Sequence, residues 1–239
     1  SQWALDDSIV GQLGSVGHYS ASAVFLGLKE DNEWELIAGG WSGVRGYHWP
    51  DRLIATAVIV DPGYTLNPND GLISKITEYL NYAGYTVSDI KKGADVTIEW
   101  LKTGLRHSVV FYRGHGSKGA TSPENYALLT DEAVTPETET MYHDDWINGR
   151  LVKTADNKYW GFTSKFIRYY YDQNRFHYSL IYAESCYSLQ FDQSGSMADA
   201  FVQCGAGVFI GYRSFISSAL GGWADADAQQ FFYDMCHKG

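Results

Sequence analysis

The run at residues 53–60 constrains the fold most strongly, because it is apolar along almost its whole length. A strand without alternating polar residues is buried on both faces, as in a parallel sheet. After this run, strand-like segments alternate with segments of helical periodicity. Further strands are expected at residues 85–90, 107–112, 180–183 and 208–212, and helices at 71–83, 94–105, 163–172, 196–204 and 223–236. This alternation predicts an α/β fold, in which helices cover both faces of a mostly parallel sheet and the strand 53–60 lies near its centre.

Residues 1–51 differ from the rest of the chain. Two strand-like segments at 21–28 and 34–38 flank a polar turn at 29–33, which predicts a β-hairpin. We therefore interpret residues 1–51 as an N-terminal β-rich extension and residues 52–239 as one main domain. Within that domain, the segment from about 116 to 161 is polar and is predicted to be irregular, and it is long enough to form a functional loop region.

The composition argues against several classes of function. The 239 residues carry a net charge of −10 without a cluster of Lys and Arg, so we expect no nucleic-acid partner. No apolar run is long enough for a membrane span, and 45% hydrophobic with 19% charged residues is typical of a globular protein. The cysteines are odd in number and widely spaced, which fits neither a disulfide framework nor a zinc site. The cellular compartment stays open.

Two of the expected buried strands lead to reactive side chains. The strand at 180–183 leads to Cys186, and the strand at 107–112 leads to His115 with Gly116 behind it. Parallel strands end at one edge of a sheet, so we expect the thiol and the imidazole in one site. A cysteine attacks as the thiolate and needs a base, which His115 can supply. Because Gly116 has no side chain, its N–H and that of Cys186 can form an oxyanion hole.

Each of these features also has a structural interpretation. A single cysteine after an apolar strand is more often a packed hydrophobic residue, and a single His-Gly pair is more often a turn. We interpret Cys204 and Cys236, in the last two helical segments, as buried small hydrophobic residues. The position of His115 and Cys186 at matching strand ends favours the catalytic interpretation for that pair.

The residues around this pair resemble the caspase-like cysteine peptidases, the clan that includes caspases, metacaspases, legumains, gingipains, clostripain and separases. Residues 109–116, Val-Val-Phe-Tyr-Arg-Gly-His-Gly, resemble the histidine block of the clan, and residues 181–188, Ile-Tyr-Ala-Glu-Ser-Cys-Tyr-Ser, resemble its cysteine block. The resemblance covers residues 52–239. It implies a caspase-like three-layer sandwich and an endopeptidase with a His115–Cys186 dyad. The caspase pentapeptide is absent, and the segment between His115 and Cys186 is longer than is common in the clan.

The resemblance also implies cleavage after Arg or Lys. Glu184 stands where metacaspases carry an acidic residue of the specificity pocket, and Asp61 ends another core strand. We expect both carboxylates, together with Tyr212, to bind the substrate side chain, with charge-assisted hydrogen bonds to a basic group. Two alternatives stay open for Glu184: a structural ion pair with Arg113 or Arg213, and a legumain-like pocket for Asn.

The alternative function is a catalytically silent caspase-like binding or scaffold module. For the peptidase, the expected partner is a peptide or protein substrate. We expect no required cofactor and no metal among the site residues. Calcium serves some clan members and stays the alternative, with His143, Asp144 and Asp145 as candidate ligands, although these residues offer fewer oxygen ligands than a calcium site needs. No serine-hydrolase, phosphate-loop or zinc-protease motif occurs. Because a caspase-like fold usually adds a strand after the last helix, we expect a continuation past Gly239 or a second chain cut from the same precursor.

Overall fold

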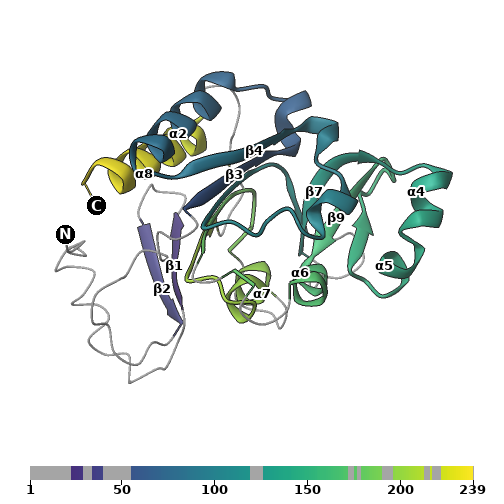
Figure 1. Ribbon diagram of the computed structural model, residues 1–239. Coiled ribbons are helices and arrows are strands. Elements are labelled where there is room, and N and C mark those ends of the chain that lie inside the picture. Colours follow the sequence, from purple (N-terminus) through teal and green to yellow (C-terminus); the bar gives the residue numbers. More distant parts are fainter. Residues whose placement is uncertain are drawn as a thin grey trace.

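The computed structural model describes residues 23–28, 34–39, 55–118, 126–171, 175–176, 179–189, 196–212, 216 and 222–238. Its main element is a seven-stranded sheet with the order β2-β1-β11-β10-β5-β3-β4. The strand bounds are β1 Ala23–Leu28, β2 Trp34–Gly39, β3 Thr56–Asp61, β4 Thr86–Lys92, β5 Val109–Arg113, β10 Leu180–Glu184 and β11 Val208–Tyr212. All neighbours are parallel except β1 and β2. The expected α/β fold with a mostly parallel sheet is confirmed (Figure 1).

Helices cover both faces of this sheet, which makes it the middle layer of a three-layer sandwich (Figure 1). One face carries α2 and α8, and the other carries α3, α6 and α7. Their bounds are α2 Asp70–Tyr82, α3 Ile98–Leu101, α6 Ser164–Tyr170, α7 Met197–Gln203 and α8 Trp223–Lys238. Successive strand residues face opposite layers, since Ile59 and Phe111 pack with α2 and α8 while Val58 and Val110 pack in the other core. This burial on both sides explains the apolar sequence of β3.

The position of β3 differs from the expectation. β3 lies next to the edge strand β4, and the centre of the sheet is occupied by β10, the strand before Cys186. Helices on both faces bury any strand that also has a strand neighbour on each side. The apolar sequence of β3 therefore indicates that helices cover both of its faces, and it does not determine the position of β3 in the strand order.

The expected N-terminal hairpin is confirmed as an antiparallel pair of β1 and β2. β1 also pairs in parallel with β11, with Val24 opposite Val208 and Leu28 opposite Tyr212. The hairpin therefore widens the main sheet on the side of β11. The polar turn expected at 29–33 lies outside the described residues.

The segment after His115, expected to be irregular, instead contains a second sheet. This four-stranded antiparallel sheet has the order β6-β7-β9-β8, and together with α4 and α5 we name it the insertion. Its elements are β6 Gly116–Lys118, β7 Tyr126–Ala133, α4 Pro136–Met141, α5 His143–Ile147, β8 Leu151–Lys153 and β9 Tyr159–Thr163. Figure 1 shows it beside the main sheet. Because β6 begins directly after His115, the insertion is joined to the fold at the candidate site.

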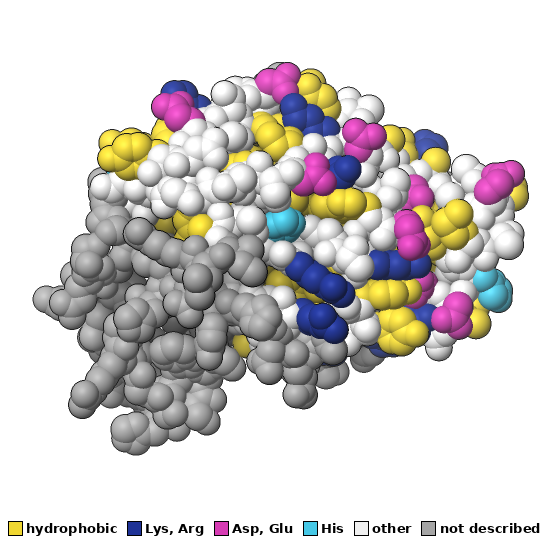
Figure 2. Space-filling model, in the orientation of Figure 1, with side chains coloured by type: hydrophobic (Ala, Val, Ile, Leu, Met, Phe, Trp, Pro, Cys, Tyr) yellow, Lys and Arg dark blue, Asp and Glu magenta, His cyan; other side chains and the backbone are white. Residues whose placement is uncertain are grey.

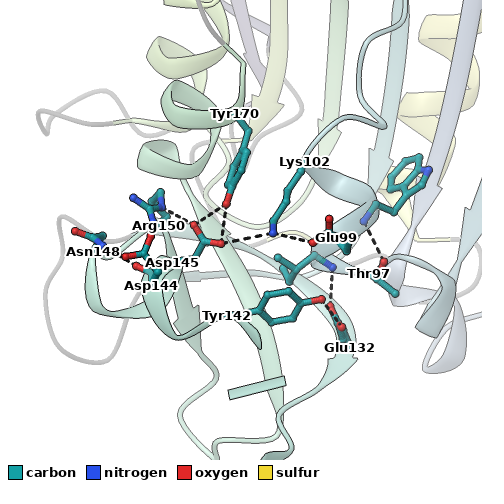
Figure 3. A network of polar contacts seen from close by, with 12 residues as sticks. Thr97, Glu99, Lys102, Glu132, Tyr142, Asp144, Asp145, Asn148, Arg150 and Tyr170 are labelled. Carbon is teal, nitrogen blue, oxygen red and sulfur yellow. Dashed lines mark hydrogen bonds and ion pairs between the residues drawn. The ribbon is translucent and has the colours of Figure 1, made fainter. Parts of the chain in front are cut away.

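A polar network fixes the insertion to the main domain (Figure 3). Asp145 of α5 is buried and ion-paired with Arg150, and it accepts hydrogen bonds of 2.8 and 2.9 Å from the hydroxyl of Tyr170, the last residue of α6. Lys102, which follows α3, lies 3.9 Å from the same carboxylate. Glu132 of β7 accepts a hydrogen bond of 2.6 Å from the first backbone N–H of α3. This partly buried network joins α5 and β7 to α3 and α6, so it restrains the orientation of the insertion against the sheet domain.

The surface combines aromatic and basic side chains. Figure 2 shows hydrophobic side chains next to Lys and Arg on the side of the molecule that carries the insertion. The ammonium of Lys153 lies 3.7 Å from the ring centre of Trp146, and the guanidinium of Arg150 lies 4.1 Å from that of Tyr169. Such cation–π contacts stabilise exposed aromatic rings. Within the described part of the chain, no helix is both long and apolar enough to cross a membrane.

Candidate active site

The carboxyl ends of β5 and β10 lie side by side at the candidate site. The two strands pair in parallel with Arg113 opposite Glu184. The pairing continues beyond the strand ends, since the N–H of Gly114 donates to the carbonyl of Glu184 at 3.0 Å. His115 and Cys186 each follow this residue pair by two positions. The structure therefore brings both segments to one edge of the sheet, with His115 exposed and Cys186 buried, whereas the contact between imidazole and thiol stays a prediction.

Gly116 lies against the backbone of Cys186. A Cβ atom at Gly116 would stand 2.1 Å from the carbonyl oxygen of Cys186 and 2.6 Å from Oγ of Ser185. Both distances are too short for any side chain, so only glycine permits this approach. The chain directly after His115 and the chain at Cys186 are therefore in close backbone contact.

The hydrogen-bond pattern of β6 and β7 fixes the direction of the N–H of Gly116. The N–H of Leu129 donates to the carbonyl of His115 at 2.9 Å, so these two residues form a hydrogen-bonded pair. Hydrogen-bonded and non-hydrogen-bonded pairs alternate along antiparallel strands. The next pair, Gly116 with Leu128, is therefore non-hydrogen-bonded. It follows that the N–H of Gly116 points away from β7, as a donor to a substrate oxyanion must.

Cys186 lies in a tight turn. The N–H of Ser188 donates to the carbonyl of Ser185 at 3.2 Å, and Tyr187 has a φ of 58°. A residue other than glycine in this left-handed region costs roughly 1 kcal/mol, so the turn depends on contacts from outside. Oγ of Ser188 provides two of them, by donating to a carbonyl of β10 at 2.9 Å and accepting from the N–H of Tyr212 at 2.9 Å.

The thiol of Cys186 contacts the backbone of Ile216. Its Sγ lies 3.4 Å from the nitrogen and 3.6 Å from the carbonyl oxygen of Ile216. Burial raises the pKa of the Cys186 thiol, and the hydrogen bond from Ile216 opposes that rise. The resting group is thus a neutral thiol at neutral pH, and its attack on a carbonyl requires a base.

The carboxylates expected to bind substrate face Arg113 instead of open solvent. The guanidinium of Arg113 lies 3.2 Å from Asp61 and 3.6 Å from Glu184, and a third carboxylate, that of Asp225, lies 3.0 Å away. Asp61 and Glu184 have 0% exposure. This geometry matches the structural alternative in which Glu184 pairs with Arg113, while Arg213 lies outside the described residues.

We name Arg113, Asp61, Glu184 and Asp225 the Arg113 cluster. Tyr212, the third residue expected to bind substrate, lies close to it. Its hydroxyl is 2.8 Å from that of Tyr182, and its ring centre is 5.7 Å from that of Trp223. Burial, with smaller contributions from Tyr182 and Glu184, raises the pKa of Tyr212 well above its ordinary value. The structure thus brings Tyr212 and Glu184 to the same sheet edge, with both tyrosine hydroxyls protonated.

The Arg113 cluster holds more negative than positive charge. Burial raises the pKa of Asp61 to about 6, although the attraction of Arg113 lowers it. Burial and the neighbouring Asp225 carboxylate raise the pKa of Glu184 well above its ordinary value, although the attraction of Arg113 lowers it. Within the described residues, neither carboxylate oxygen of Glu184 has a hydrogen-bond partner.

We expect Asp61 to make the folded protein less stable as the pH rises from about 4 to about 6. The pKa of Asp61 is about 6 in the fold against an ordinary value of 3.8, so between these values the folded state holds more protons than the unfolded state. Stability then falls as pH rises, by at most about 3 kcal/mol for this shift, and the raised pKa of Glu184 extends the trend upward. Urea unfolding across this range measures the slope, which Asp61→Asn should flatten. A slope that is equally steep in Asp61→Asn contradicts the assignment.

Several residues of the site were missed by sequence reasoning. Asp225 completes the Arg113 cluster, and the side-chain amide of Asn69, the N-cap of α2, donates to it at 2.7 Å. In sequence, Asp225 has the appearance of an ordinary acidic residue in the first turn of a helix. Tyr126 and Ser185, whose hydroxyls meet beside Gly116, carry no local signal at all.

The segment considered for calcium has other partners. His143, Asp144 and Asp145 lie on α5, and both aspartates are ion-paired with Arg150. In the described ranges, no group of three or more His, Cys, Asp or Glu side chains is arranged to hold a metal ion. The acidic pair therefore serves the network that fixes the insertion.

Comparison of the chain with protein-family models, curated proteins and solved structures gives no match in any of the three. The resemblance to caspase-like peptidases therefore rests on the two residue blocks around His115 and Cys186. Fold alone does not determine function, so the activity must be argued from the groups at the site.

Proposed function

We propose that the chain is a cysteine endopeptidase with Cys186 as the nucleophile and His115 as the base. The observation that carries the proposal is the close backbone contact of Gly116 with Cys186, which joins the two segments that resemble the peptidase blocks. The direction of the Gly116 N–H supports it further, because acyl transfer needs donors aimed at the developing oxyanion.

In the proposed reaction, His115 takes the thiol proton while Sγ of Cys186 bonds to the carbonyl carbon of the substrate. The carbonyl electron pair moves to oxygen, where the N–H groups of Gly116 and Cys186 stabilise the negative charge. Collapse of this intermediate breaks the C–N bond, and His115 gives its proton to the leaving amine. Water, deprotonated by His115, then attacks the thioester and releases the acid and the free thiol. Proton transfer during attack suits a thiol whose pKa is raised.

Cleavage after Arg or Lys is the finer part of the proposal, and the charge balance of the Arg113 cluster supports it. Three carboxylates surround one guanidinium, and no described residue donates a hydrogen bond to Glu184. A basic substrate side chain would supply the missing positive charge. Because Glu184 is buried, that side chain must first displace part of its present packing. A pocket for Asn, and a scaffold without turnover, are the competing proposals.

We expect Cys186 to be labelled by peptidyl acyloxymethyl ketones that present Arg, Lys, Asn or Asp next to the ketone. His115→Ala should slow labelling by roughly 100-fold at neutral pH, because a general base contributes about 10²–10⁴ in rate. His143→Ala, which changes an exposed histidine of the insertion, is the matched control and should label at the rate of the parent protein. Intact-protein mass spectrometry measures the rates, and peptide mapping locates the adduct.

The outcomes separate the candidate functions. Equal labelling of the parent protein and His115→Ala would make Cys186 an ordinary reactive thiol and favour the scaffold. Faster labelling by the Arg and Lys probes, lost in Glu184→Gln, supports the basic pocket. Faster labelling by the Asn probe overturns that pocket and favours legumain-like cleavage, while the peptidase proposal stands.

A further inference from the structure

Two hydroxyl groups meet behind the turn that carries Cys186. Oη of Tyr126, the first residue of β7, lies 3.1 Å from Oγ of Ser185, and both side chains are buried. Gly116 packs against the same pair, since a Cβ atom there would stand 2.4 Å from Tyr126 Oη and 2.6 Å from Ser185 Oγ. The hydroxyl pair therefore lies beside Gly116, which also packs against the backbone of Cys186, and the N–H groups of these two residues are expected to bind the oxyanion.

The turn at Cys186 depends on contacts of this kind because Tyr187 is held in the left-handed region. Ser188 connects the turn to β10 and β11 of the main sheet. The hydrogen bond between Tyr126 and Ser185 connects it to the insertion, which also carries Gly116. Burial raises the pKa of Tyr126, so its phenol keeps a proton for this hydrogen bond.

We propose that Tyr126 is a positioning residue, which sets the distance between the N–H groups of Gly116 and Cys186 by holding Ser185. The insertion holds Tyr126 in place, because the network around Asp145 anchors the antiparallel sheet to the main domain. The kinetic consequence rests on the proposed peptidase function. The mechanical coupling between Tyr126 and the turn at Cys186 does not depend on it.

Tyr126→Phe removes the hydroxyl and leaves the ring. We expect kcat to fall by about 10-fold to 100-fold with KM changed by less than about threefold, because a displaced oxyanion donor weakens transition-state binding most. Ser185→Ala should give the same loss, and the double variant should lose no more than either single one, because all three remove one interaction.

Tyr142→Phe is the matched control. Tyr142 is also buried in the insertion, and its hydroxyl donates to Glu132 at 2.9 Å, on the side of the insertion that meets α3. This variant should lose thermal stability to a degree similar to Tyr126→Phe and keep its kcat. If Tyr142→Phe loses as much kcat as Tyr126→Phe, the effect is general destabilisation and the positioning role is overturned.

Alkylation of Cys186 by iodoacetamide tests the coupling without a substrate. A loosened turn should expose the thiol, so the midpoint pH of alkylation should move down toward that of an ordinary thiol in Tyr126→Phe and Ser185→Ala, but not in Tyr142→Phe. Unchanged alkylation together with unchanged kcat overturns the proposal, as does an additive loss in the double variant. If no peptide is cleaved but the midpoint shifts as expected, the peptidase function fails and the positioning of the turn stands.

Discussion

Gly116→Ala is expected to lower kcat/KM by about a thousandfold or more. The new methyl group would stand 2.1 Å from the carbonyl oxygen of Cys186, whereas ordinary contact begins at 3.4 Å. The clashing atom belongs to the backbone, so it cannot move without moving Cys186, the proposed nucleophile. A displacement of about 1 Å alone can cost about 10² in rate, and a lost oxyanion donor costs about 10²–10³.

Gly63→Ala is the matched control for this substitution. Gly63 follows β3 at the same edge of the sheet, but its methyl group would lie at the ordinary distances of 3.5 Å from Cα of Gly114 and 3.6 Å from Oδ1 of Asp61. We expect unchanged activity and melting temperature. Turnover of a fluorogenic peptide and thermal unfolding compare the two variants. Similar kcat/KM values for Gly116→Ala and Gly63→Ala would contradict a role for the close approach of Gly116 to Cys186 in the proposed mechanism.

The main sheet could be predicted because each buried strand carries a local signal. β3, β5 and β10 are apolar except at their ends since helices cover both faces, and this pattern requires no knowledge of neighbouring strands. Strand order is not a local property of the sequence. The sequence therefore predicts neither the position of β3 beside the edge strand nor the central position of β10. The insertion was missed for the same reason: β6 and β8 are only 3 residues long, and their pairing with β7 and β9 depends on tertiary contacts.

The same distinction between local signals and distant contacts applies to the residues of the candidate site. His115, Gly116 and Cys186 could be proposed from sequence because parallel strands bring their carboxyl ends to one edge. The groups that fix them could not be. Tyr126 lies in a polar segment without clear periodicity, and Asp225 is 112 positions from Arg113. Contacts over such separations are decided when the elements pack, and a local pattern does not record them.

The Arg113 cluster shows how strongly these distant contacts shape the site. Arg113 ends β5 two positions before His115, and its partners end β3, end β10 and lie in the first turn of α8. One guanidinium therefore joins four elements at the edge that carries the candidate dyad. The same contacts involve carboxylates that the sequence predicts to bind the substrate. The contribution of these contacts to the stability of the fold can be measured separately from any activity.

Arg113→Met is expected to destabilise the folded protein by about 3–5 kcal/mol. The buried guanidinium lies 3.0–3.6 Å from the carboxylates of Asp61, Glu184 and Asp225. It also donates to the carbonyl of Asn67 at 2.9 Å. Its removal leaves buried acidic groups without a counter-charge, which is the costly way to break an ion pair. The loss should be smaller at about pH 5 than at about pH 8, because protonation neutralises the carboxylates.

Arg168→Met is the matched control for this prediction. Arg168 binds Asp199 at 2.7 Å, but the two side chains are 29% and 47% exposed, so its loss should cost less than about 1 kcal/mol. Urea unfolding at both pH values measures each variant. Adding Asp225→Asn to Arg113→Met should restore part of the lost stability, because it removes one of the uncompensated charges. Equal losses for the two arginine variants, or a loss for Arg113→Met that does not vary with pH, would mean that charge compensation does not hold this edge of the sheet together.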